Sequence, residues 1–157
     1  MAAQFQRWWR DYEEHHRAEG NQWCHMVGIP LIIAGLLGLL AVEVFRLRGL
    51  PVEAALLLVL AAGGAYLWLE PRLGAVMFGV SLVIYLGARL LDWRVALALF
   101  IVGWVFQLVG HSVYEKRSPA FLGNVAHLLI GPLWVLHHLT GLRPPAWDAS
   151  ASPRSDE

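Results

Sequence analysis

Long apolar runs without a single charge fill the middle of the chain, and short polar segments separate them. The runs cover residues 26–42, 54–69, 73–88 and 95–113, and the separating segments 46–51, 70–72 and 89–94 have the length of tight turns. A membrane-spanning helix needs roughly 17–25 apolar residues, and flanking Arg and Glu side chains extend a short span by reaching toward the surface. The pattern predicts four transmembrane helices in succession and no β-structure.

A fifth apolar stretch, residues 122–142, carries three of the histidines and is interrupted by Gly131 and Pro132. It fits a kinked span, a re-entrant segment or an interfacial helix. Residues 143–157 are polar and proline-rich, which is typical of a disordered tail. We therefore expect one membrane-embedded domain over residues 1–142, followed by a disordered tail.

The N-terminal segment has the periodicity of an amphipathic helix. Aromatic residues and one histidine recur on a single helical face: Phe5, Trp8, Trp9, Tyr12 and His16. Such a face is typical of a helix that lies in the membrane interface. His15 falls about 100° away from it, and the pair Gly20-Asn21 is expected to end the helix.

Composition supports the membrane assignment. Of the 157 residues, 57% are hydrophobic and 15% charged, against roughly 45–50% and 25% in soluble domains. The alternative, a soluble helical bundle, would leave the four runs without polar faces for water. A net charge of 0 without a basic tract argues against nucleic acid as a partner, and the single cysteine, Cys24, excludes an internal disulfide.

Orientation follows from the distribution of basic residues. Four spans place the N-terminus and the segment after residue 113 on one side, which carries slightly more Arg and Lys than the other. The positive-inside rule then places the N-terminus in the cytoplasm. Eleven arginines to one lysine, with abundant Ala, Leu and Gly, suggest a GC-rich bacterial gene and hence a cytoplasmic membrane.

Polar residues at the end of the fourth run indicate chemistry. Gln107, His111 and Glu115 are spaced i, i+4, i+8 and would share one face of a regular helix. Buried polar groups in a membrane bind substrates and ions, or they pair with neighbouring helices to hold the bundle together. His111 with Glu115 suits a metal ligand and a carboxylate that orients it or takes a proton.

Topology brings further histidines to the same level. His16 and His25 flank the start of the first span and His111 lies at the end of the fourth, so four alternating spans put all three on one side of the membrane. Three converging imidazoles predict a metal site, for which Fe, Zn, Cu or Ni would serve. The sequence contains no GxSxG, P-loop, GxGxxG or HExxH motif.

Three sequence blocks carry a family resemblance. They are Tyr12-x3-His16-x4-Asn21-x3-His25 with Gly28-x-Pro30, then Gln107-x2-Gly110-His111-x3-Glu115 with Pro119-Ala120, and Leu129-Ile130-Gly131-Pro132-Leu133-Trp134-x2-His137. In this order, over residues 5–140, they resemble the 2-hydroxy fatty acid dioxygenase family of small multi-pass membrane proteins.

The resemblance implies an Fe(II)-dependent alpha-oxidation in which a 2-hydroxy fatty acid and dioxygen give an acid one carbon shorter. It implies His16, His25 and His111 as metal ligands and His137 as a fourth, with His127 or His138 as alternatives for the fourth place. We expect catalytic roles for Asn21 and Glu115.

Substrate binding and rival functions complete the expectations. We expect Gln107 and Arg117 to bind the substrate, with Arg17 or Lys116 as alternatives to Arg117 for the carboxylate. One rival function is haem binding through His25 and His111. The other is a non-catalytic membrane scaffold in which the histidines only pack.

Overall fold

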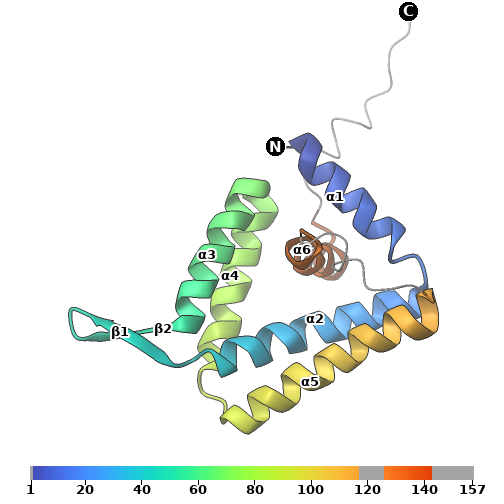
Figure 1. Cartoon of the computed structure of the whole chain (residues 1–157). Helices are drawn as coiled ribbons and strands as arrows, with labels where there is room; N and C mark the ends of the chain where they lie inside the picture. Colours follow the sequence, from blue (N-terminus) through green and yellow to red (C-terminus); the bar gives the residue numbers. More distant parts are fainter. Residues whose placement is uncertain (1, 117–125, 143–157) are drawn as a thin grey trace, which may run out of the picture.

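The computed structural model describes residues 2–116 and 126–142 and is almost entirely helical (Figure 1). The elements are α1 (Ala2–Glu14), α2 (Glu19–Leu39), β1 (Glu43–Leu47), β2 (Leu50–Glu53), α3 (Ala54–Leu69), α4 (Pro71–Ala88), α5 (Trp93–Val109), the π-helix η1 (Gly110–Glu115) and α6 (His127–Thr140). The predicted all-helical bundle is confirmed in outline. The predicted tail, residues 143–157, lies outside the described residues.

Two helix pairs form the frame of the molecule. In the first pair, α2 and α5 lie side by side along their length because glycines let their backbones meet (Figure 1). A Cβ on Gly103 would come within 2.8 Å of the Gly28 carbonyl oxygen, and one on Gly35 within 2.7 Å of the Ala96 carbonyl oxygen. Small residues at such crossings are characteristic of helix packing in membranes.

The second pair, α3 and α4, is an antiparallel hairpin with a tight turn. Glu70 caps α4 by accepting a hydrogen bond from the Leu73 N–H, and Pro71 occupies the first turn, where its missing N–H costs nothing. A Cβ on Gly74 would overlap the Tyr66 carbonyl, and one on Gly63 would overlap the Phe78 ring. The two helices therefore touch along one line, in a defined register.

Three helical segments have the length and composition of membrane spans. They are Glu19–Leu39, Pro71–Ala88 and the continuous segment Trp93–Glu115, formed by α5 and η1. Helix α3 is apolar but has only 16 residues. Three of the four predicted spans thus meet the length that a bilayer requires, and the third predicted run extends to the full α4.

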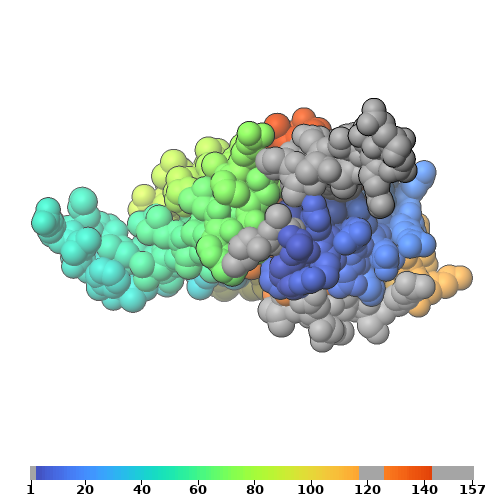
Figure 2. Space-filling view, turned by 90° about the horizontal axis from the view of Figure 1, so that it is seen from above, coloured from blue at the N-terminus to red at the C-terminus, as the bar shows by residue number. Residues whose placement is uncertain are grey.

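A β-hairpin joins α2 to α3. The tight turn predicted within residues 46–51 is present, but strands flank it, so the prediction of helices alone is wrong. Arg48 and Gly49 occupy the turn with φ of 51° and 86°, the signature of a two-residue type I′ hairpin. Cross-strand pairs such as Phe45–Val52 and Leu47–Leu50 then share one face. Arg-Gly is a weaker hairpin signal than Asn-Gly, which is why the pattern alone did not reveal it. The hairpin projects away from the helices (Figure 2).

Helices α1 and α6 cover the space between the two pairs (Figure 1). The predicted apolar face of α1 is confirmed: Phe5, Trp9 and Tyr12 are buried, and they pack in one cluster with Ile130 and Leu133 of α6. This face therefore contacts protein. Helix α6 runs continuously through Pro132.

The chain turns earlier than predicted between α1 and α2. Helix α1 ends at Glu14, and α2 begins at Glu19 and includes Gly20 and Asn21 in its first turn. A Cβ on Gly20 would overlap the ring of Tyr114. This glycine serves a close approach of two segments rather than the end of a helix.

Candidate metal centre

Three buried histidines meet where α1, α2 and η1 come together. His16 lies in the connection from α1 to α2, His25 in the second turn of α2, and His111 in η1. Their exposed fractions are 2%, 2% and 3%. One ring nitrogen of each lies within 4.8 Å of the others, and the ring centroids are 4.3 to 5.0 Å apart. The predicted convergence of these residues is thus seen in the structure.

Backbone carbonyls fix the orientation of two imidazoles. The His16 Nδ1 lies 2.6 Å from the Tyr12 carbonyl oxygen, and the His25 Nδ1 lies 2.9 Å from the Asn21 carbonyl oxygen. A carbonyl only accepts, so each Nδ1 carries the proton and each Nε2 presents a lone pair. The two Nε2 atoms are 3.1 Å apart.

Two lone pairs facing each other repel unless a proton or a cation lies between them. Metal–nitrogen bonds of about 2.1 Å that meet near a right angle span this separation. A Nδ1–H donated to a carbonyl with Nε2 on the metal is the usual arrangement of a ligating histidine. The donor set therefore fits a divalent transition metal.

Burial keeps His16 in the form that a metal requires. Burial away from water, together with the neighbouring His25, lowers the pKa of His16 to about 2, although the hydrogen bond to the Tyr12 carbonyl acts in the opposite direction. Only the neutral imidazole binds a metal, so no proton competes for this nitrogen at physiological pH.

His111 lies in a π-helix that keeps the predicted polar face. From Gly110 to Glu115 the backbone widens, and π-turns of this kind occur frequently at functional sites. The turns are wider than in a regular α-helix, but the predicted common face is kept, because all three residues contact α2. The Gln107 Nε2 lies against Gly28, the His111 ring lies 4.8 Å from the His25 ring, and Glu115 accepts a hydrogen bond from Asn21. Gln107 and His111 also line one cavity.

Glu115 joins η1 to the first turn of α2. Its Oε1 accepts a hydrogen bond from the Ala18 N–H at 2.7 Å and one from the Asn21 side-chain amide at 3.3 Å. Within residues 2–116 and 126–142 these donors, and no imidazole, are its hydrogen-bond partners. Glu115 thus holds together the two segments that supply His25 and His111.

Asn21 is completely buried directly beside the histidines. Its Oδ1 has no hydrogen-bond partner among the described residues, and Gly110 packs against it so closely that a Cβ there would overlap this oxygen. An unpaired buried carbonyl oxygen costs roughly 1–3 kcal/mol. Asn21 is not among the residues that line the cavity beside the histidines, so this oxygen faces the packed contact between α2 and η1.

Tyr12 lies at the site, although the sequence analysis placed it only on the interfacial face and at the start of the first resemblance block and gave it no role. Its ring stacks on His16 with centroids 3.9 Å apart and an interplanar angle of 14°. Burial raises the pKa of its phenol far above the usual range, so the hydroxyl keeps its proton. That hydroxyl has no partner among the described residues. Its position four residues before His16 was the signal that could have identified it.

The remaining histidines lie outside the three-histidine group. His127 is buried and bonded through Nε2 to Asp11 at 2.9 Å, and its ring lies edge-on to Tyr12 at 5.6 Å. The His137 Nδ1 is 2.6 Å from the Leu142 carbonyl oxygen, and its ring contacts Trp9. The His138 Nδ1 approaches the Trp134 carbonyl at 3.0 Å. The sequence analysis expected His137 as a fourth ligand, but the structure does not place it with the other three histidines.

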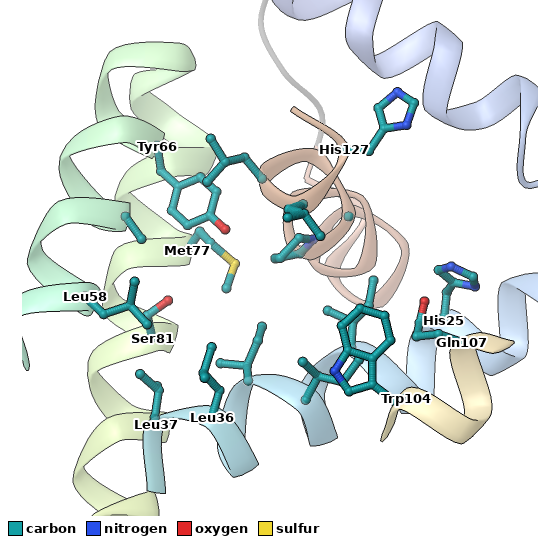
Figure 3. A pocket seen from close by; sticks show the side chains of 18 of the residues that line it. His25, Leu36, Leu37, Leu58, Tyr66, Met77, Ser81, Trp104, Gln107 and His127 are labelled. Carbon is teal, nitrogen blue, oxygen red and sulfur yellow. The ribbon is translucent and has the colours of Figure 1, made fainter. Parts of the chain in front are cut away.

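An apolar cavity of about 450 Å³ begins at the histidines and extends between the two helix pairs (Figure 3). Aliphatic and aromatic side chains form most of its wall, and no Lys or Arg lines it among the described residues. Gln107 lies at the histidine end beside His25, and its Nε2 has no partner in the described part of the chain. Arg117 falls outside the described residues, and Lys116 is exposed.

Comparisons with known proteins give a consistent result. The family model described as "2-hydroxy-palmitic acid dioxygenase Mpo1-like" matches residues 2–143. The curated 2-hydroxy-palmitic acid dioxygenase MPO1 of Saccharomyces cerevisiae is 32% identical over 133 residues, which are 80% of this chain and 73% of the yeast protein. No solved structure matches the chain.

Proposed function

The chain belongs to the Mpo1-like family and is an enzyme, and from this membership we propose that it oxidises 2-hydroxy fatty acids with dioxygen at an Fe(II) centre. The single observation that carries the proposal is the group of three buried imidazoles, His16, His25 and His111, at the head of an apolar cavity. The residues that could hold a metal thus lie directly beside a cavity that could hold an acyl chain.

The reaction balances without a further co-substrate. A 2-hydroxy acid, RCH(OH)COOH, and O₂ give RCOOH, CO₂ and H₂O. The bond between the first two carbons breaks, and the second carbon becomes the new carboxyl carbon. Dioxygen takes up all four electrons that the acid loses, so neither a nicotinamide nor 2-oxoglutarate is needed.

The three histidines would hold the iron and leave other coordination positions open, as oxygenases with few protein ligands do. Bound Fe(II) supplies the activation of dioxygen and a Lewis acid for the oxygens of the substrate. His16 and His25 are held through Nδ1 by backbone carbonyls, so their orientation precedes metal binding.

Unpaired polar atoms around the centre suit the head of a 2-hydroxy acid. The Tyr12 hydroxyl and the Gln107 amide N–H belong to residues that line the cavity and can donate to a carboxylate. Both of these groups are buried without a partner among the described residues. Asn21 does not line the cavity and would instead position His25, whose Nδ1–H donates to the Asn21 backbone carbonyl. Glu115 acts at a distance, by fixing Asn21 and the start of α2.

The apolar walls of the cavity would bind the acyl chain of the substrate. They exclude water from the acyl chain and leave the carboxyl end at the histidines. We propose that α3 is the fourth, short span, that the enzyme lies in a bacterial cytoplasmic membrane with its N-terminus in the cytoplasm, and that the acid enters from the lipid.

The geometry favours a single ion over haem. The His25 and His111 rings lie edge to face at 4.8 Å, and both also contact the His16 ring. Bis-histidine ligation of haem requires two rings on opposite faces of a porphyrin. Rings that contact one another leave no space for that macrocycle.

The test uses protein purified without a histidine tag. We expect about one iron per chain, no Soret band, and oxygen consumption with a 2-hydroxy acid that yields the acid one carbon shorter. A protein without a transition metal would instead support the scaffold function. A Soret band would support haem.

A further inference from the structure

We infer that the end of the cavity opposite the histidines, formed by Leu37, Val59 and Ser81, sets the longest acyl chain that the enzyme accepts. This rests on the proposed function, because it takes the cavity as the place of the acyl chain. We call these three residues the floor. They come from α2, α3 and α4, and all three line the cavity.

The floor lies at the far end from the metal centre. Figure 3 shows Leu37 and Ser81 beside the α3–α4 pair, whereas His25 and Gln107 lie at the opposite side. Along α2, His25 and Leu37 are twelve residues apart, which corresponds to about 18 Å. This length suits a long-chain acyl group and is too great for a short acid.

Val59 and Ser81 stand at the same level on adjacent helices. The close contacts of Gly74 with Tyr66 and of Gly63 with the Phe78 ring define the antiparallel register. Continued one turn further, this register places residue 59 opposite residue 81. Two short side chains therefore face the cavity at one height, and a larger one at either position would fill its end.

The floor is backed by tightly packed protein. Leu37 and Val59 also belong to a buried apolar cluster with Ala55, Tyr85 and Ala88. Their exposed fractions, 3% and 2%, show that no open space lies behind them. Since packed interiors yield little, a chain that is too long has nowhere to extend.

Ser81 is the residue at which the limit is most easily moved. It lies between Met77 and Tyr85 on one buried face of α4, spaced i, i+4 and i+8. A serine between two large side chains leaves a gap, and this gap is part of the cavity. The hydroxyl lies in an otherwise apolar neighbourhood, so space rather than polarity explains the small residue.

The experiment measures kcat/KM for a series of 2-hydroxy acids of increasing length, with iron-loaded protein in lipid nanodiscs. For the unaltered enzyme we expect kcat/KM to rise about fourfold per added methylene and then to fall at least tenfold beyond a limiting length. Ser81→Leu should move this limit to acids about two carbons shorter, because leucine adds two heavy atoms. Val59→Ala should move it to longer acids.

Controls separate size from general damage. Val83→Phe adds bulk to the exposed side of the same helix and should keep the original limit. Iron content should be equal in all variants, and in Val83→Phe the kcat for every acid should stay within about twofold of that of the unaltered enzyme. An unchanged limit in both Ser81→Leu and Val59→Ala would overturn the inference, as would an equal loss at every chain length with iron retained.

A further experiment tests the chain-length limit independently of the proposed oxidation. Binding of radiolabelled acids is measured without dioxygen, so that no turnover occurs. A length limit in binding that moves with Ser81→Leu would support the floor even if 2-hydroxy acids are not oxidised. Oxidation of these acids without any limit that Ser81→Leu or Val59→Ala moves would keep the function and refute the floor.

Discussion

The two ends of the cavity are built in opposite ways. Around the histidines the chain buries polar atoms that have no hydrogen-bond partner among residues 2–116 and 126–142: the Tyr12 hydroxyl, the Asn21 Oδ1 and the Gln107 Nε2. At the floor it buries methyl and methylene groups, and a single serine hydroxyl is the exception.

This difference suggests that the histidine end carries out the reaction and that the floor selects the substrate. Unpaired buried polar groups are costly and persist where a ligand completes them. Apolar walls carry no such directional requirement, and their effect depends on volume. At the histidine end, a change of only a few atoms should therefore abolish activity. At the floor, a change of similar size should alter which substrates are accepted.

The largest effect is expected from the three histidines that we propose as metal ligands. His16→Ala, His25→Ala and His111→Ala should each lower metal content to background and oxidation at least about 100-fold, since each removes one of the three proposed ligands. Metal analysis and oxygen consumption on the same preparation test this. His15→Ala alters a half-buried neighbour outside the group and should keep its metal; equal loss in this variant would contradict the assignment.

A single methyl group at Gly110 should be nearly as damaging. Gly110→Ala pushes a Cβ into the Asn21 Oδ1 and against the Cys24 side chain. Gly110 directly precedes His111, so this clash should displace the His111 imidazole. We expect oxidation to fall about 10- to 100-fold, because a displacement near 1 Å has effects of this size. Gly87→Ala adds the same methyl group where nothing lies within 4 Å and should be silent. Similar rates in both variants would show that the histidine end tolerates movement.

Removing the Tyr12 hydroxyl should separate stability from activity. Tyr12→Phe keeps the ring stacked on His16 but deletes a buried donor that lacks a partner among the described residues. The free energy of unfolding should stay equal or rise by about 1 kcal/mol, while kcat/KM for a 2-hydroxy acid falls about tenfold. Thermal unfolding and kinetics are measured together. A loss of stability would mean that the hydroxyl has a structural partner.

The smallest effect at this end is expected from Glu115. Glu115→Gln keeps one acceptor oxygen for the Ala18 N–H and the Asn21 amide, so metal should be retained and stability should fall by about 1 kcal/mol. Turnover should fall less than in Gly110→Ala. Glu115→Leu removes both bonds and should cost more. Loss of iron in the Gln variant would instead identify the carboxylate as a ligand.

Part of this architecture follows from the sequence. Long uncharged apolar runs predict helices, and all four runs are helical, three of them with the length of a membrane span. Alternation of the four runs also predicts that His16, His25 and His111 lie at one level, and the structure brings them together. The amphipathic period of α1 places Tyr12 and His16 on one face before any tertiary contact is known. These features follow from the periodicity of the chain and the order of its segments, which is why the sequence could predict them.

Other features were decided by packing between segments distant in sequence. The π-turn at His111 exchanges one hydrogen-bond pattern for another of similar energy, so a local pattern cannot reveal it. The Arg48-Gly49 hairpin likewise depends on strand pairing. His127 and His137 share one short helix, and only the docking of α1 on α6 places one beside Tyr12 and the other beside Trp9. The floor exists because the α3–α4 register sets Val59 opposite Ser81, and a register is a property of two helices in contact rather than of either sequence.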